Sequence, residues 1–174
     1  MADKRVFLDT NVIIECFCIG VWSELSQGYR LETVDEVVTE AMTGITSRPD
    51  RVAVDRTLLL AGLAQQPHSV TRKDRNGLLR HYPSMATLDP GELNLFAYLN
   101  SHELPLAPLI VIGTADKGAI AAARLPGWLD QLVSLEELLK LAKVSRAKLD
   151  LVGSQHTVSF LSEVRTKVFF GIIP

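Results

Sequence analysis

The strongest constraint on the fold is a short apolar run near the start of the chain that ends at an acidic residue. The run covers residues 6–8, Asp9 follows it directly, and a helical pattern continues from Thr10. A strand that passes at once into a helix is typical of parallel sheets, in which a helix leads to the next strand. Four strands are expected, over residues 5–8, 29–33, 109–112 and 132–134. The alternation of strands and helices predicts an α/β fold with a central parallel sheet that helices cover on both faces.

Helices are expected between and after these strands. Capping signals begin two of them, at Thr33 and Ser134, each followed by Glu three residues later, and Pro90 stands at the first position of another. The expected helices cover residues 10–26, 33–44, 52–64, 72–80, 89–101, 117–123 and 134–149. The final segment is ambiguous, because residues 158–170 have the pattern of a helix whereas residues 168–173 could form a strand.

The size and charge of the chain narrow the class of protein. It has 174 residues, of which 47% are hydrophobic and 22% charged, and this balance is typical of a globular chain rather than a disordered one. We expect a single domain over residues 1–174, with a C-terminal extension from about residue 145 to 174. The net charge of -2 excludes attraction of nucleic acid by bulk charge, so such binding would need a local patch.

The two cysteines and the absence of long apolar runs indicate the cellular compartment of the protein. Cys16 and Cys18 stand two positions apart on an expected helix, so their side chains point in different directions. We interpret both as small apolar residues in a reducing compartment rather than as a disulfide. Charged residues lead directly into the first strand, and no apolar run reaches the roughly 18 residues of a membrane span. These features predict a cytoplasmic protein without a signal peptide or a membrane partner.

Four acidic residues fall where the expected fold would bring them to one edge of the sheet. Asp9 and Asp116 follow the ends of two strands that we expect to be neighbours. Glu40 lies among apolar residues of a helix, and Glu92 lies in the first turn of another. Carboxylates that lie close together repel each other unless a divalent cation neutralises them. Oxygen ligands favour Mg²⁺ or Mn²⁺, and such a site would support hydrolysis of phosphodiester bonds.

Each of these acids also has a purely structural interpretation. Asp9 and Asp116 could cap the helices that follow them. Glu92 could be the capping-box partner of Asp89, whose position directly before a proline is typical of an N-cap. Glu40 could be a solvated helix residue.

Two further polar residues accompany the acids. Asn11 lies two residues after Asp9, where it could orient a water molecule or a metal ion, or be an ordinary polar residue of the first helical turn. Thr114 could form a hydrogen bond to a ligand, or it could only close the turn after the strand at 109–112. We treat both as candidate supporting residues.

A basic segment provides the candidate contacts with nucleic acid. Between residues 48 and 80 the chain has seven Lys or Arg residues and three acids. The candidates for contact with a phosphate backbone are Arg72, Lys73, Arg75 and Arg80. A solvated, charged helix face is the alternative interpretation. The four histidines have no metal-binding spacing, and no nucleophilic triad is evident.

The acids and their surroundings resemble the motifs of PIN-domain ribonucleases. Residues 6–13, Val-Phe-Leu-Asp-Thr-Asn-Val-Ile, are similar to the opening motif of that family, in which Asp9 corresponds to the first metal-binding acid and Asn11 to its companion. The contexts Val-Thr-Glu-Ala, Pro-Gly-Glu-Leu-Asn-Leu and Thr-Ala-Asp-Lys resemble those of the second, third and fourth acids, which here are Glu40, Glu92 and Asp116. The match in order and context runs from about residue 5 to 125.

The resemblance implies a three-layer α/β/α sandwich, dependence on Mg²⁺ or Mn²⁺, and cleavage of single-stranded or structured RNA. The four acids would hold the metal and act in catalysis, with Asn11 and Thr114 in support. Many relatives are toxins of toxin–antitoxin pairs, so an antitoxin and a second copy in a homodimer are expected partners. The chain is longer than the compact toxins, and Ala115 stands where related motifs often have a second Asp.

Two other functions are alternatives. An aspartyl-phosphate type phosphatase also begins with a strand that ends in Asp, but such enzymes generally need a second Asp two positions later, where this chain has Asn11. The other alternative is a non-catalytic PIN-like module that binds RNA or a protein. An absence of Mn²⁺ binding would favour that module.

Overall fold

The strands of the structure form one parallel sheet. The computed structural model describes residues 4–43, 53–103 and 107–173. The strands within this part of the chain are β1 (Arg5–Leu8), β2 (Arg30–Glu32), β3 (Ile110–Gly113) and β4 (Leu132–Val133). Their order is β2-β1-β3-β4, and each neighbouring pair is parallel. The predicted α/β class with a central parallel sheet is confirmed.

Helices make up most of the rest of the described chain. They are α1 (Thr10–Cys18), α2 (Trp22–Gly28), α3 (Asp35–Thr43), α4 (Arg56–Gly62), α5 (Arg72–His81), α6 (Pro90–His102), α7 (Lys117–Ala122), α8 (Leu135–Leu141), α9 (Arg146–Leu149) and α10 (Val158–Phe169). Short 3₁₀ turns lie at η1 (Pro83–Thr87), η2 (Leu129–Gln131) and η3 (Ser154–His156). Thr71, Ser134 and Thr157 accept hydrogen bonds from amides three residues later and so fix the starts of α5, α8 and α10.

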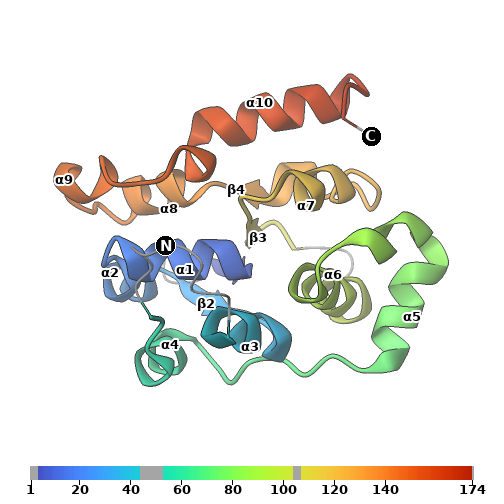
Figure 1. The fold of residues 1–174 in the computed structure, drawn as a ribbon, viewed down its shortest axis with the longest axis horizontal. Helices are drawn as coiled ribbons and strands as arrows, with labels where there is room; N and C mark the ends of the chain where they lie inside the picture. The colour runs from blue at the N-terminus through green and yellow to red at the C-terminus, as the bar shows by residue number, and fades with distance from the viewer. Residues whose placement is uncertain (1–3, 44–52, 104–106, 174) are drawn as a thin grey trace.

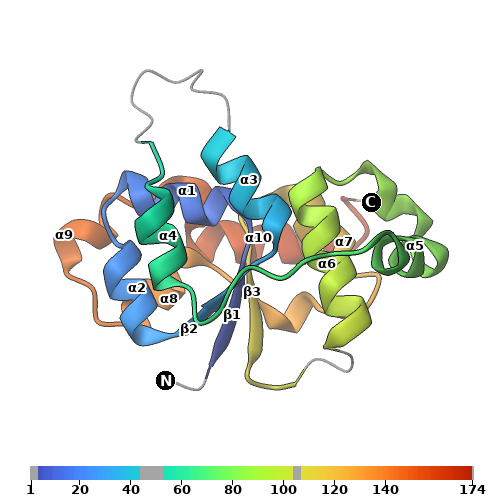
Figure 2. The same cartoon turned by 90° about the horizontal axis from the view of Figure 1, so that it is seen from below.

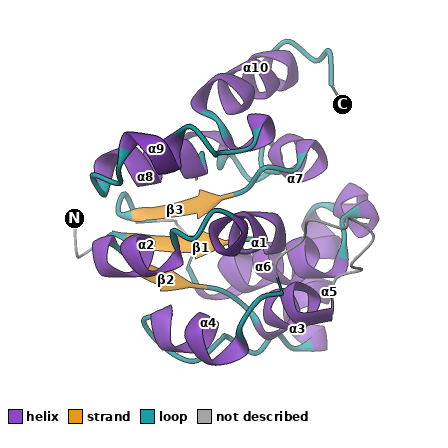
Figure 3. Cartoon of the chain, turned by 60° about the vertical axis from the view of Figure 1, so that its left-hand side comes forward, coloured by secondary structure: helices purple, strands orange, loops and turns teal. Residues whose placement is uncertain are grey.

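The helices lie in two layers that enclose the sheet. Figure 1 shows α1, α2 and α8 on one face of the sheet, and α6 and α7 on the other. Helix α4 lies beyond the β2 edge and α10 lies beyond the β4 edge, where it packs on α7 (Figures 1 and 3). Helix α5 packs on the outer side of α6 (Figure 2). The arrangement is a three-layer α/β/α sandwich.

The central strands position the site. Val6, Phe7 and Leu8 of β1 are completely buried because helices cover both faces of the sheet, which explains why the run is apolar without alternation. Leu8 pairs with Gly113 of β3. The residues that follow these two positions therefore leave the sheet at the same edge, outside the carboxyl ends of the strands.

Two long predicted helices are divided in the structure. The helix predicted over residues 10–26 is split into α1 and α2, because Gly20 adopts a φ of +66° between them and turns the chain. The helix predicted over residues 134–149 ends with α8, and Lys143 lies in the left-handed region at a φ of 58° before α9 begins. Both predictions were wrong about the length of the helix.

Other boundaries differ more modestly. Thr33 does not cap α3, because its hydroxyl donates to the carbonyl of Leu8 at 2.8 Å and the helix begins at Asp35. The helix predicted over residues 52–64 is present as the shorter α4, which Asp55 caps. The predicted start at residue 52, and the end of the preceding helix near residue 44, lie outside the described residues.

The last segment forms a helix. Val168 lies inside α10, so the helical alternative for the end of the chain is confirmed and the strand alternative is wrong. In the part of the chain that the structure describes, no helix combines the length and apolar character needed to cross a membrane.

Candidate active site

Asp9 stands at the carboxyl end of β1 and uses its two oxygens differently. Oδ1 accepts a hydrogen bond from the amide of Val12 at 2.9 Å and caps α1. Oδ2 is buried and has no hydrogen-bond partner among the described residues. Burial raises the pKa of Asp9 to about 6, although Thr114 and the Val12 amide act in the opposite direction. The capping role and a free, buried oxygen therefore coexist in one side chain.

Asp116 reaches the same edge from β3. The amide of Asp9 donates to the carbonyl of Gly113 at 3.1 Å, which locks the two strand ends together. Asp116 caps α7, since its Oδ1 accepts from the amides of Gly118 at 2.6 Å and Ala119 at 3.0 Å. Its own amide donates to the hydroxyl of buried Thr114 at 3.3 Å. Thr114 thus shapes the turn that presents Asp116.

Glu92 completes a group of facing carboxylates. It lies in the first turn of α6 and only 8% of its surface is exposed. Burial raises the pKa of Glu92 to about 8, and the charges of Asp116, Asp9 and Asp89 add to this rise. The ion pairs formed within the described residues involve none of these four acids. Negative charge accumulates here without a neutralising side chain.

Glu40 lies beside this group, and both of its carboxylate oxygens accept hydrogen bonds from within the fold. Its Oε2 accepts from the hydroxyl of Thr10 at 2.7 Å, and its Oε1 accepts from the amide of Gly91 at 2.8 Å. A Cβ atom on Gly91 would lie 2.3 Å from Oε2 of Glu40. Glu40 therefore joins α1, α3 and the first turn of α6, and it positions the turn that contains Glu92.

The donors present fit a hydrated hard cation better than a cage made only of protein atoms. Among the described residues, no three Asp, Glu, His or Cys side chains are arranged to hold one metal ion together. Mg²⁺ commonly keeps several water ligands and binds through one or two carboxylates. The free Oδ2 of Asp9 and the carboxylates of Glu92 and Asp116 supply oxygen only. That chemistry fits Mg²⁺ or Mn²⁺.

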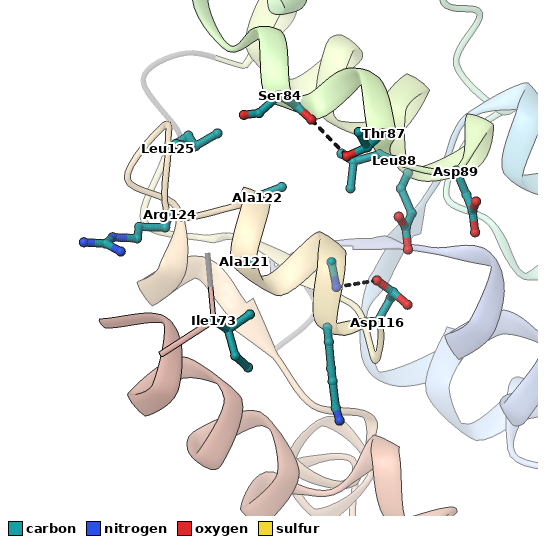
Figure 4. Close-up of a pocket in the computed structure, with 13 residues that line it drawn as sticks. Ser84, Thr87, Leu88, Asp89, Asp116, Ala121, Ala122, Arg124, Leu125 and Ile173 are labelled. Carbon is teal, nitrogen blue, oxygen red and sulfur yellow. Dashed lines mark hydrogen bonds between the residues drawn. The ribbon is translucent and has the colours of Figure 1, made fainter. Parts of the chain in front are cut away.

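A pocket of about 750 Å³ opens next to these acids. Figure 4 shows Asp89 and Asp116 at one end, with Leu125 and Ile173 at the other. Asp89 stands at the N-cap position of α6, as expected, but its side chain forms no capping hydrogen bond. Its carboxylate lines the pocket.

Of the predicted supporting residues only Thr114 lies at the acids, and neither Asn11 nor the predicted RNA-binding residues are gathered at the pocket. Asn11 lies exposed in the first turn of α1. Arg75 donates to Oδ1 of Asn94 on α6 at 3.2 Å, a contact within the fold. Arg72, Lys73 and Arg80 are exposed along α5. The residues that line the pocket in the described part of the chain include none of these five.

Sequence reasoning missed the roles of several residues around the site. Thr10 and Gly91 are the hydrogen-bond partners of Glu40, and Ile173 forms part of the pocket wall. A close contact at Gly91 could be expected from the sequence, because glycine in the first turn of a helix is unfavourable unless another group occupies the space of a side chain. Thr10 and Ile173 had no such signal, since their roles depend on how distant elements pack.

Comparisons of the chain with models of known protein families, with curated protein sequences and with solved structures gave no match. The chemistry of the site is therefore described by its own side chains: buried carboxylates, one free buried oxygen, and an adjoining pocket.

Proposed function

We propose that this protein is a metal-dependent endoribonuclease, which hydrolyses phosphodiester bonds of RNA. The observation that carries the proposal is the convergence of Asp9, Glu92 and Asp116 at one sheet edge, with no cationic partner among the described residues. RNA as the substrate rests on the resemblance of the four acidic motifs to PIN-domain ribonucleases. The adjoining pocket supports a substrate larger than a single phosphate group.

The roles of the residues follow from their positions. One or two of the carboxylates of Asp9, Glu92 and Asp116 would bind a hydrated Mg²⁺ or Mn²⁺ directly, and the remainder would bind its water ligands. When bound, the cation would offset the charge of the phosphate and lower the pKa of a water molecule. Glu40 keeps the first turn of α6 in place through the Gly91 amide, and Thr114 keeps Asp116 in its turn. Asn11 is exposed at the start of α1, where a substrate could reach it.

The reaction requires only water as a co-reactant. The water oxygen bonds to phosphorus while the bond from phosphorus to O3′ breaks, and O3′ takes a proton. The products would be a 3′-hydroxyl and a 5′-phosphate. The acids bind and orient the reacting groups, so their loss should reduce kcat more than substrate affinity.

The test is cleavage of a mixed-sequence RNA in Mn²⁺ by the wild type and by Asp9→Asn. We expect Asp9→Asn to lose at least about 100-fold in rate and to keep its fold, because the amide oxygen can still accept from Val12. Asp55→Asn is the matched control, since Asp55 caps α4 in the same way but does not line the pocket. Undiminished cleavage by Asp9→Asn, or in excess EDTA, would contradict the proposal.

A non-catalytic RNA- or protein-binding module is the second candidate. Asp9 and Asp116 also cap the helices that follow them, a structural role that such a module would retain. Calorimetric titration with Mn²⁺ separates the two functions, because the enzyme should bind the ion and Asp9→Asn should bind it more weakly. No binding by the wild type would favour the module.

We also propose a reducing, cytoplasmic setting, because both Cys16 and Cys18 are free thiols. The antitoxin and the homodimer stay predictions, and copurification with a neighbouring gene product and light scattering would test them.

A further inference from the structure

The pocket beside the acids changes in character along its length. One end has the carboxylates of Asp89, Glu92 and Asp116. The remaining wall is largely apolar and comes from Leu88, Ala121, Ala122, Leu125 and Ile173. A volume of about 750 Å³ lies within the range of roughly 300–1,000 Å³ usual for small-molecule sites. An occupant should therefore combine an anionic group bound through a cation at one end with an apolar part at the other.

The two basic residues of the pocket are directed toward α10. The Nη1 atom of Arg124 donates to the carbonyl of Val168 at 2.9 Å. The Nζ atom of Lys117 lies 5.9 Å from the centre of the Phe160 ring. The apolar end is consequently unsuited to a run of phosphates, which would need free cations along it.

The end of the chain supplies part of the wall. Helix α10 ends at Phe169, and Gly171, with a φ of +69°, then reverses the chain. The amide of Ile172 donates to the carbonyl of Lys167 at 2.8 Å. The side chain of Ile172 stays 69% exposed, whereas Ile173 lines the pocket. Arg124 also holds this end of α10, through its hydrogen bond to the carbonyl of Val168. The C-terminal extension is thus built into the substrate pocket.

We propose that the apolar part of this pocket binds the base of the nucleotide next to the cleaved phosphodiester bond, with Ile173 as a specificity-determining contact. The inference rests on the proposed ribonuclease function and adds where the substrate lies. A base can enter the pocket only if it leaves its helical stack, so the nucleotide must be unpaired. The phosphate attached to it then reaches the carboxylate end.

The first experiment removes the base from the substrate. Single-stranded RNAs carry one abasic nucleotide on either side of the cleaved bond, and their kcat/KM in Mn²⁺ is compared with that of the intact RNA. We expect one of the two abasic substrates to lose about tenfold, because an apolar contact is lost without any change to the phosphates. Equal kcat/KM for all three RNAs would overturn the inference.

The second experiment changes the wall. Ile173→Ala should reduce the difference in kcat/KM between intact and abasic RNA. Ala122→Phe should lower kcat/KM for the intact RNA, because the larger side chain fills the pocket. Ile172→Ala and Ala147→Phe are the matched controls, since both residues are exposed and neither lines the pocket. Circular dichroism confirms that each variant is folded. Pocket variants that behave like their controls would contradict the assignment.

A binding measurement separates this inference from the ribonuclease proposal. RNA with 2-aminopurine at the flanking position reports burial of the base through its fluorescence, whether or not cleavage occurs. A response that Ala122→Phe abolishes, in a protein that cleaves no RNA, would overturn hydrolysis and support the base pocket. Cleavage with no fluorescence response in the wild type would overturn the base pocket and leave the hydrolysis intact.

Discussion

In Asp9 and in Asp116, one carboxylate oxygen caps a helix and the other remains at the candidate site. One oxygen of each carboxylate caps the following helix. The second oxygen of Asp9 is buried without a partner among the described residues. A helix cap and a candidate metal ligand are thus compatible roles for one side chain, and the cap fixes the direction in which the free oxygen points.

Glu92 makes stability depend on pH, and the sign can be derived. Its pKa rises from the usual 4.5 to about 8 in the fold. Between these pH values the folded chain holds a proton that the unfolded chain has released, so stability falls as pH rises through this range. We expect Glu92→Gln to be more stable than the wild type above pH 8 by about 1–3 kcal/mol. Urea denaturation in EDTA at pH 4 and pH 8.5 measures the difference.

The same variant has an internal control. Near pH 4 the wild-type carboxyl is mostly protonated in both states, so most of the advantage of Glu92→Gln should disappear. Mn²⁺ should stabilise the wild type at pH 8 and have little effect on Glu92→Gln. A variant that is less stable than the wild type at both pH values would show that the ionised Glu92 carboxylate does not destabilise the folded state.

At the scale of elements, the first turn of α6 depends on a contact between two helices. Glu40 on α3 accepts a hydrogen bond from the amide of Gly91 in the first turn of α6. The same turn contains Glu92. A Cβ atom at position 91 would meet the carboxylate of Glu40 as long as that carboxylate keeps its hydrogen bonds to Thr10 and Gly91. The glycine is therefore required by tertiary packing, since most other residues are better helix formers.

We expect Gly91→Ala to destabilise the protein by about 1–3 kcal/mol, because the added methyl group meets Oε2 of Glu40. Gly77→Ala in α5 is the matched control, since a Cβ atom there would meet nothing within 4 Å. The control should gain up to about 1 kcal/mol from helix propensity. Thermal denaturation of both variants measures the contrast, and equal effects of the same sign would refute the role of Gly91.

Elements differed in how well the sequence could predict them. Because a buried apolar run has clear limits, the strand before Asp9 has the predicted bounds, and the strand before Thr114 ends one residue later than predicted. The orientation of Glu40 could not be predicted, because the rotation of α3 depends on its packing against α1 and α6. The break at Gly20 had a residue signal, but a glycine in an apolar helix does not by itself say whether the helix continues.

At the scale of the whole molecule, a buried histidine helps to attach the C-terminal extension. Glu15 on α1 accepts a hydrogen bond from the amide of Gly153 at 2.7 Å. Atom Nε2 of His156 lies 3.9 Å from Oε2 of the same glutamate. His156 is 2% exposed, and its Nδ1 has no partner within the described ranges. Burial lowers the pKa of His156, while Glu15 partly opposes the shift.

This pKa shift predicts weaker stability in acid. As pH falls below about 6.5, the unfolded histidine takes up a proton that the buried histidine resists, so the folded state loses stability. We expect His156→Gln to lose less stability than the wild type between pH 7 and pH 5, as measured by urea denaturation. Parallel curves for the two proteins would argue against a neutral, buried His156.

The extension also shows what sequence reasoning cannot reach. The sequence allowed either a helix or a strand at its end. The contribution of Ile173 to the pocket wall could not be predicted, because it depends on how α10 packs on α7. The basic residues of α5 were grouped by proximity along the chain. The fold places them on an outer helix instead of around the acids (Figure 2).

The pairing of Leu8 with Gly113 has a consequence for synthesis on the ribosome. A nascent chain that has not yet released β3 contains Asp9 but lacks the strand that holds it beside Thr114 and Asp116. Such a chain has no complete carboxylate edge, so the proposed ribonuclease would stay inactive beside the messenger and ribosomal RNA during translation. Any hazard to that RNA would begin only after the later strands had emerged and paired.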